Sequence, residues 1–114
     1  MRPRGSAAVR RDDDPFVALD GVLQHRARIG AAVLLARHER LSFSRLKELL
    51  KETDGSLGAQ MRKLEDAGYV AVRKEFQDRR PVTWYALTAK GRRALSQHLD
   101  GLQRLIEEAR RAPE

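Results

Sequence analysis

The sequence predicts a mixed α+β fold that is mainly helical, and three observations support this prediction. Apolar residues recur at the helical spacing of three and four over residues 16–67 and again over residues 88–110. Between these stretches, residues 70–87 alternate apolar and polar side chains with the period of two that is typical of strands. A chain of 114 residues has room for one domain with one modest core. We therefore expect one ordered domain over residues 15–110.

The N-terminal part of the chain divides into a tail and a helical segment. Residues 1–14 combine Arg, Gly, Ser and Ala with three consecutive aspartates and have no apolar periodicity, so we expect a disordered tail. Order is expected to begin near Pro15. The helical periodicity of residues 16–40 predicts either one helix or a short helix that leads into a longer one at Asp20 and Gly21.

Two short helices separated by a tight turn are expected next. Residues 41–43 are long enough only for an edge strand or a connector, and Ser44 is placed to cap a helix that ends near Glu52. In the following turn, Asp54 is placed to accept backbone N–H groups of the third helix. The third helix is expected to end where Gly68 can adopt the left-handed conformation.

The third helix has two contrasting faces. An apolar stripe formed by Leu57, Met61 and Leu64 is expected to face the core. The opposite face carries small and charged residues, namely Ala59, Arg62, Lys63 and Asp66. Such a face leaves room for a close approach to a partner.

The last third of the chain predicts a β-hairpin and a long helix. Residues 70–87 form the hairpin, with a charged tip at residues 78–81. Thr88 is placed to cap a helix that runs to about Arg110. Apolar residues in this helix follow the spacing of a short coiled-coil seam: Leu95, Leu99, Leu102, Ile106 and Ala109.

The order helix, short strand, helix, turn, helix, hairpin and helix is that of a winged helix-turn-helix with a two- or three-stranded wing. In this arrangement the helix after the turn enters the major groove of DNA, and small residues let its backbone approach the base edges. The net charge of +7 and the pI near 10.5 favour a polyanionic partner. The predicted DNA-binding residues are Ser44, Ser56, Ala59, Gln60, Arg62 and Lys63 on the helices and Arg73, Lys74, Arg79 and Arg80 in the wing.

The apolar seam of the last helix must be covered to be shielded from water. A small monomer has little core left to cover it at the end of the chain. A second copy of the chain is the expected cover, which predicts a homodimer. The predicted interface residues are Ile29, Val33, Leu95, Leu99, Leu102 and Ile106. Trp84 is expected to be structural, packing across the hairpin or on the last helix, rather than a platform for stacked bases.

The chain resembles the winged-helix transcriptional regulators of the MarR and ArsR groups, especially their short, stand-alone members. The resemblance covers about residues 25–105 and rests on the segments 41–47 (LSFSRLK), 53–57 (TDGSL), 63–70 (KLEDAGYV), 79–81 (RRP) and 85–92 (YALTAKGR). It implies a recognition helix at residues 54–67 and a wing at residues 70–87. It also implies a homodimer with flanking N- and C-terminal dimerisation helices that binds a near-palindromic operator as a repressor. Where such proteins often carry Ser or Thr followed by His, this chain has Gly58, Ala59 and Gln60.

Other classes of function find little support in the sequence. Without cysteine, the chain has neither disulfides nor thiolate metal sites, and a reducing cytoplasmic setting is expected. The longest apolar run, residues 29–36, is too short to span a bilayer. The sequence has no nucleophile next to a base, no paired carboxylates in an apolar setting and no glycine-rich phosphate loop. We therefore expect neither an enzyme nor a cofactor. The three histidines, His25, His38 and His98, are isolated, so we expect no metal site.

Two questions remain open at this point. The same fold can serve as a protein-protein interaction module whose affinity for nucleic acid is incidental. An effector ligand, if there is one, would bind between the dimer helices and the helix-turn-helix. Phe16, Leu19 and Leu23 are placed to line such a pocket, but core packing explains them equally well.

Overall fold

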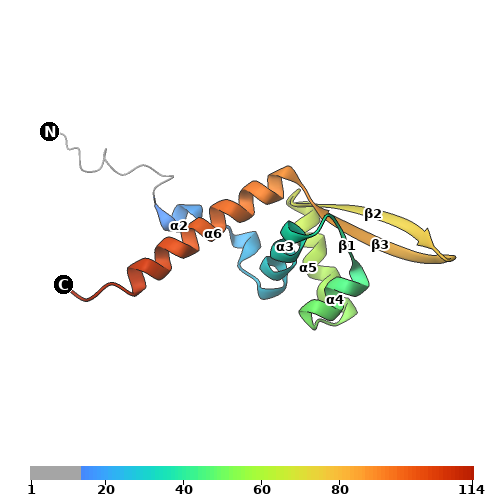
Figure 1. Cartoon of the computed structure of the whole chain (residues 1–114), viewed down its shortest axis with the longest axis horizontal. Helices are drawn as coiled ribbons and strands as arrows, with labels where there is room; N and C mark the ends of the chain where they lie inside the picture. The colour runs from blue at the N-terminus through green and yellow to red at the C-terminus, as the bar shows by residue number, and fades with distance from the viewer. Residues whose placement is uncertain (1–13) are drawn as a thin grey trace.

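A three-stranded antiparallel sheet and a cluster of short helices form one end of the molecule, and a long helix leads away from them (Figure 1). The computed structural model describes residues 14–114, so the tail predicted for residues 1–14 lies outside the described residues except for Asp14. In chain order the elements are α2 (Pro15–Ala18), the 3-10 helix η2 (Gly21–Leu23), α3 (Arg26–Arg37), β1 (Leu41–Ser42), α4 (Phe43–Leu50), α5 (Asp54–Asp66), β2 (Val70–Gln77), β3 (Arg80–Leu87) and α6 (Ala89–Ala109). The predicted winged helix-turn-helix with a three-stranded sheet is confirmed.

The sheet has the order β1-β3-β2, with β3 in the centre. Residues 70–77 pair with residues 87–80 without interruption, and Leu41 pairs with Tyr85 at the edge. The hairpin turn consists of Asp78 and Arg79 alone, both with positive φ (53° and 67°), which is the geometry of a type I′ turn. The predicted charged tip of residues 78–81 is therefore shorter than expected, because Arg80 and Pro81 already belong to β3.

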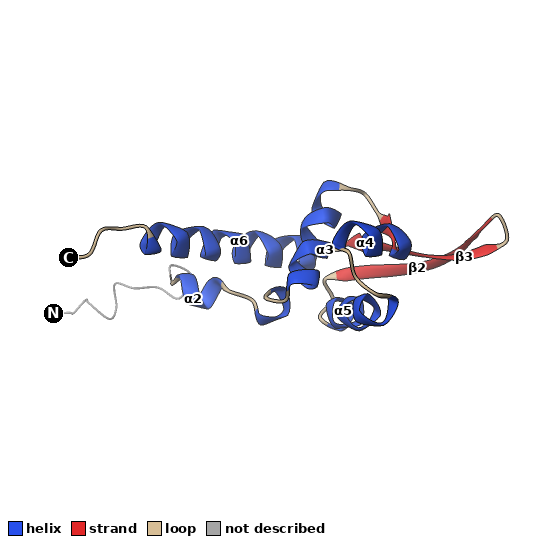
Figure 2. Ribbon diagram, turned by 90° about the horizontal axis from the view of Figure 1, so that it is seen from below, coloured by secondary structure: helices blue, strands red, loops and turns tan. Residues whose placement is uncertain are grey.

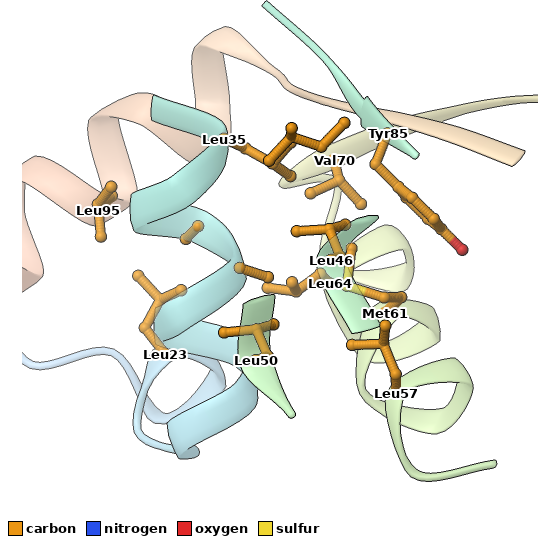
Figure 3. Close-up of a cluster of buried hydrophobic side chains, with 13 residues drawn as sticks. Leu23, Leu35, Leu46, Leu50, Leu57, Met61, Leu64, Val70, Tyr85 and Leu95 are labelled. Atoms are coloured by element: carbon orange, nitrogen blue, oxygen red, sulfur yellow. The ribbon is translucent and has the colours of Figure 1, made fainter. Parts of the chain in front are cut away.

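The core lies where α3, α4 and α5 meet the base of the sheet (Figure 3). Leu35, Leu46 and Leu64 are completely buried there, and Val70 and Tyr85 contribute from the strands. The apolar stripe predicted for the third helix is confirmed, since Leu57 and Met61 are also no more than 1% exposed.

The segment 16–40 is broken more often than the sequence predicts. Helix α2 ends at Ala18, a single 3-10 turn follows, and the long helix begins at Arg26 rather than at Asp20 and Gly21. His25 caps α3 by accepting the N–H of Ala27 at Nδ1 (3.1 Å). The break is stabilised by tertiary contacts, because the backbone N–H of Asp20 donates to Nδ1 of His98 on α6 (2.8 Å).

The caps of the helix-turn-helix differ from those predicted by two residues at α4 and by one residue at α5. Ser42, rather than Ser44, caps α4 by accepting the N–H of Arg45 (3.1 Å). Thr53, rather than Asp54, caps α5 by accepting the N–H of Ser56 (3.1 Å). In both cases the hydroxyl lies three residues before the N–H that it accepts, which is the usual N-cap geometry. Helix α4 correspondingly ends at Leu50 instead of near Glu52.

The two predictions for the ends of the wing are confirmed. Gly68 has a φ of 79° and ends the turn after α5 in the left-handed region. Thr88 caps α6, since its hydroxyl oxygen accepts the N–H of Gly91 (2.9 Å) and its hydroxyl donates to the carbonyl of Gly68 (2.7 Å). These bonds connect the start of α6 to the base of the wing.

Helix α2 packs along the distal half of α6, away from the sheet (Figure 2). The contact is close because α6 has a glycine at this position. A Cβ on Gly101 would lie 2.9 Å from the carbonyl oxygen of Pro15 and 3.0 Å from the Cβ of Ala18. Asp14, which is predicted from the sequence to belong to the tail, caps α2 by accepting the N–H of Phe16 (2.9 Å).

Candidate nucleic-acid interface

Helix α5 presents one face to the core and the opposite face to the outside of the molecule. Ala59, Arg62, Lys63 and Asp66 are all exposed, as predicted for the outer face of this helix. Within residues 14–114, neither Arg62 nor Lys63 forms an ion pair with a carboxylate. Both charges are therefore available to a polyanion.

The first turn of α5 is fixed by polar contacts from α3 and α4. The carboxylate of Glu52 accepts hydrogen bonds from the Arg26 guanidinium and, at 2.6 Å, from the Ser56 hydroxyl. Lys47 Nζ lies 2.8 Å from a carboxylate oxygen of Asp54. The Ser56 hydroxyl is predicted from the sequence to contact DNA, but here it donates a hydrogen bond to Glu52 and positions the helix.

Gln60 also has a partner within the protein. Its side-chain oxygen accepts a hydrogen bond from the Arg28 guanidinium of α3, and the same guanidinium donates through Nε to the carbonyl of Val22 (2.5 Å). Gln60 is half-buried, so the structure places it on the flank of α5 that faces α3. The sequence did not reveal this contact, because the two residues are 32 positions apart.

The other flank of α5 faces the sheet. Burial raises the pKa of Tyr85, the negative charge of Glu65 raises it further, and the positive charge of Arg62 opposes both. Because these charges act on Tyr85 of β3, Arg62 and Glu65 mark the side of α5 next to the wing. Arg62 therefore lies between the exposed face of the helix and the hairpin.

The wing carries exposed cations on both of its faces. In the register of the hairpin, Arg73 pairs with Trp84 and Lys74 pairs with Thr83, so Arg73 and Lys74 point to opposite sides. Arg73 lies 4.0 Å from the carboxylate of Glu75, whereas Lys74, Arg79 and Arg80 form no ion pair among the described residues. All four predicted wing residues are exposed.

Trp84 is part of a structural contact at the edge of the sheet. The guanidinium of Arg40 lies 3.9 Å from the centre of the indole ring and also binds Glu75 at 3.3 Å. The side chain is half-buried, consistent with the expected structural role, although its partner is Arg40 rather than the last helix.

Sequence reasoning missed one cation near the start of α5, the predicted recognition helix. Lys51 lies in the turn between α4 and α5, is exposed, and has a φ of 57°. A left-handed Lys has no clear sequence signal, because Gly and Asn are the residues that favour this conformation. Ser44, predicted to contact DNA, is exposed on the first turn of α4.

The predicted dimer residues fall into two groups. Leu95 is only 4% exposed and Ile29 packs against the same core, so their own chain already covers them. Leu99 and Ile106 are 41% and 43% exposed. Leu102 is half-buried between them, and Val33 is exposed on α3. Leu95 differs from the prediction because α3 reaches the first half of α6 within the monomer.

Two apolar residues of α2 add to this exposed surface. Phe16 is 69% exposed and Val17 is 46% exposed. Leu23, in contrast, is completely buried in the core, and Leu19 packs near Gly101. The three residues considered for an effector pocket therefore do not converge on one cavity. Shallow hollows remain at the surface, and one of about 410 Å³ lies between η2, α3 and α5.

A short helix-turn-helix followed by a cationic hairpin defines a winged-helix DNA-binding protein. The family model described as "Winged helix DNA-binding domain" matches residues 27–106, and the chain belongs to this family. An uncharacterized protein of Methanocaldococcus jannaschii is 36% identical over 72 residues, which cover 63% of this chain and 78% of that protein.

Solved structures agree with this assignment. A transcriptional regulator homologue from Pyrococcus horikoshii has a TM-score of 0.73 at 28% identity and covers 79% of this chain and 89% of its own. A MarR-family regulator from Silicibacter pomeroyi has the same fold, with a TM-score of 0.60 and 16% identity over 91% and 69% of the two chains. The fold also recurs in ZitR of Lactococcus lactis, solved in complex with DNA, with a TM-score of 0.58 and 17% identity over 80% and 62%. The resemblance to winged-helix regulators drawn from the sequence is confirmed.

No helix within residues 14–114 has the length and apolar character needed to cross a bilayer. In the same part of the chain, His, Asp and Glu side chains form no group of three that would hold a metal ion.

Proposed function

We propose that this winged-helix regulator binds a specific double-stranded DNA sequence as a homodimer and represses transcription. Helix α5, with the residues up to 67, enters the major groove, and the wing of residues 70–87 contacts the adjacent minor groove or backbone. The operator has two half-sites related by the two-fold axis of the dimer, about one helical turn apart.

The observation that carries this proposal is the continuity of positive charge from α5 to the wing. Arg62 and Lys63 are exposed on α5 and free of ion pairs among the described residues, and Arg62 lies on the flank next to the sheet. Arg79 and Arg80 continue this charge at the hairpin tip, which projects beyond the helices (Figures 1 and 2). Lys and Arg at such positions displace condensed counterions from DNA phosphates.

The small outer face of α5 supports a close approach to bases. Gly55 and Ala59 are exposed on this face, and a Cβ added at Gly55 would meet nothing within 4 Å on the protein side. The first turn is fixed by Glu52 and Thr53, so the helix is positioned before DNA arrives. Direct base contacts from this turn are therefore made through the backbone, and those from later in α5 are made through Arg62 or Lys63.

The exposed apolar residues of α2 and α6 support the homodimer. Leu99 and Ile106 line one side of α6, while Phe16 and Val17 lie on α2, which packs against the same helix. Burying such residues against an identical surface is favourable by about 25 cal/mol for each Å² of apolar area. In a two-fold dimer the same patch serves both subunits.

The test is selection of bound duplexes from a random DNA pool at near-physiological salt, followed by affinity measurements on the enriched sequence. An enriched inverted repeat with half-sites about 10 base pairs apart is expected. The logarithm of the affinity should fall with the logarithm of the salt concentration, with a slope of about −0.9 for each phosphate contacted.

Charge-removing variants locate the interface. Arg62→Ala and Arg79→Ala should each weaken binding to the selected duplex, whereas Arg93→Ala removes the same charge from an exposed site on α6 and should not. Equal loss in all three variants would indicate general electrostatic attraction instead of the proposed interface. No enriched sequence, together with a stable protein partner, would favour the interaction module.

A further inference from the structure

Phe76 has an unusual position for a large apolar side chain. It is 79% exposed, more than any other large apolar residue among the described residues, and it lies one position before the end of β2. Its cross-strand partner is Pro81, which is also exposed. The tip of the wing therefore presents an aromatic ring next to a proline ring.

The fold itself does not require an apolar residue here. The face of β2 that begins with Val70 and Val72 packs on the core, but the next residue on that face is Lys74, which is exposed. Phe76 follows four residues after Val72, about 13 Å further along the strand. It is thus beyond the reach of the core, and burial of its ring depends on a partner outside the described chain.

The face on which Phe76 lies is the one that α5 packs against. Val72 pairs with Tyr85 in the hairpin, and the Tyr85 ring lies on the side of the sheet where Met61 and Leu57 of α5 are found (Figure 3). Because alternate residues of a strand share a face, Phe76 is on the same side of the wing as the recognition helix. A duplex contacted by α5 would pass this side of the hairpin.

Cations surround the apolar pair. Lys74 precedes it on the same face, Arg79 follows in the turn and Arg80 follows as the first residue of β3; all three are exposed. Asp78 is the acidic residue of the tip. An apolar wedge bordered by cations suits a DNA minor groove, where the cations meet two lines of phosphates and the apolar group enters between base pairs.

We propose that Phe76, supported by Pro81, is a wedge that enters the minor groove and partly unstacks one base-pair step, bending the operator. This inference rests on the proposed DNA-binding function. The bend expected for such a wedge is about 20–90° toward the major groove. Pyrimidine–purine steps such as TA and CA are the easiest to kink, so the wedge selects these steps at the operator positions under the wing.

The test compares wild type with Phe76→Ala, Phe76→Leu and a matched control, Val82→Ala, which lies on the opposite face of the hairpin. Each protein is used for duplex selection from a random pool. The bend is measured by energy transfer between dyes at the ends of the selected duplex, and unstacking by the fluorescence of 2-aminopurine at the step under the wing. Thermal unfolding without DNA checks that the variants are folded.

Wild type should bend the duplex, increase the 2-aminopurine fluorescence and enrich TA or CA steps under the wing. Phe76→Ala should lose all three effects and bind about tenfold more weakly or worse, as expected for removing one buried Phe ring. Phe76→Leu should keep part of the bend, and Val82→Ala should behave like wild type.

If wild type selects an operator, and Phe76→Ala bends and unstacks this operator as much as wild type does, the wedge is overturned. The DNA-binding function is then left intact. Failure of wild type to select any duplex would overturn both proposals. Reduced self-association of Phe76→Ala in sedimentation, with unchanged DNA bending, would assign the ring to a protein contact and would also overturn the wedge.

Discussion

The helices in the two halves of this molecule bury their large apolar side chains to different degrees. In the head, formed by residues 26–95, one or more leucines of each of α3, α4 and α5 are completely buried, and the sheet closes the core on one side; these leucines are Leu35, Leu46, Leu57 and Leu64. In the arm, formed by residues 14–20 and 96–109, α2 contacts α6, but Phe16, Leu99 and Ile106 remain exposed. The head is thus a complete folding unit, whereas the arm has an apolar surface left over for a partner.

Polar contacts replace apolar packing where the arm meets the head. The carboxylate of Asp20 accepts hydrogen bonds from the Tyr69 hydroxyl and from the backbone N–H of Val22. The backbone N–H of Asp20 donates to Nδ1 of His98. Burial, with a contribution from the Asp20 hydrogen bond, raises the pKa of Tyr69 to about 12. This network joins the end of α5 to α6, so it relates the position of the arm to that of the proposed DNA-binding surface.

The largest difference between head and arm is expected for the same truncation at two leucines. Leu64→Ala leaves a cavity in the head and should lower the free energy of unfolding by about 2–5 kcal/mol. Leu99→Ala removes a side chain that is 41% exposed and should change it by about 0.5 kcal/mol or less at low protein concentration. Urea denaturation at several protein concentrations measures both effects.

The dependence of stability on protein concentration shows whether Leu99 is buried in a dimer. If Leu99 is buried between two subunits, wild type becomes more stable as its concentration rises, and Leu99→Ala loses part of that gain. Equal losses for Leu64→Ala and Leu99→Ala at low concentration would show that the arm is as tightly packed as the head.

Two glycines of α6 provide the next comparison. A Cβ at Gly91, in the head, would lie 2.2 Å from the backbone oxygen of Tyr69, the same oxygen that accepts the N–H of Thr88. At Gly101, in the arm, the nearest atom is the carbonyl oxygen of Pro15, 2.9 Å away. Because the short helix α2 can move and the base of the wing cannot, Gly91→Ala should destabilise the protein by about 2–3 kcal/mol.

Gly101→Ala should leave global stability almost unchanged. Alanine favours the helix by up to about 1 kcal/mol over glycine, which offsets part of the lost contact with α2. Amide hydrogen exchange of residues 14–24 should nevertheless become faster, since α2 is displaced from α6. Slow exchange of this segment in Gly101→Ala would contradict the description of α2 as a separately attached element.

The same contrast between local and tertiary interactions explains how much the sequence could predict. The order of elements, the apolar stripe of α5, the left-handed Gly68 and the cap at Thr88 all depend on near neighbours in the chain, and all were predictable. The cap at Ser42 was missed by two residues and the cap at Thr53 by one, because two capping residues lie within two positions of each other in both places.

Contacts between distant residues account for the other differences. The break after α2 depends on His98, 78 residues from Asp20, and the position of Gln60 depends on Arg28 of another helix. Phe76 fitted the alternation of β2, but only the length of the hairpin beyond the core shows that its ring is exposed. The charged residues of the site were predictable as exposed cations, while their arrangement relative to one another was not.

The caps of α5 and α2 test the contrast at a smaller scale. Thr53→Ala should cost about 1 kcal/mol of global stability, because α5 belongs to the cooperative head. Asp14→Ala removes an equivalent cap from the four-residue helix α2 of the arm and should have almost no effect on global unfolding. Thermal unfolding of both variants, with Thr53→Ser as the conservative control, measures the difference. A larger loss in Asp14→Ala would place α2 in the same folding unit as α5.

The smallest effect is expected from the titration of His98, which lies where the two halves meet. Burial lowers the pKa of His98, and the nearby negative charge of Asp20 opposes this shift only in part. Nδ1 also accepts the N–H of Asp20, so a proton on that nitrogen would break the hydrogen bond. The folded protein therefore holds His98 neutral at pH values where the unfolded chain already binds a proton.

The sign of the pH dependence follows from this difference. Above the unfolded pKa of about 6.5 both states are neutral at His98, and its contribution to stability is fully present. As the pH falls below about 6.5, the unfolded state gains the proton first, and stability is lost until the pH passes the folded pKa. His98→Gln, which keeps an acceptor for Asp20 but does not titrate, should remove this part of the slope in urea denaturation between pH 8 and 5. His38→Gln changes a histidine at an exposed position, and this control should keep the wild-type slope. Identical slopes in wild type and His98→Gln would show that protonation of His98 does not affect the stability of the folded protein.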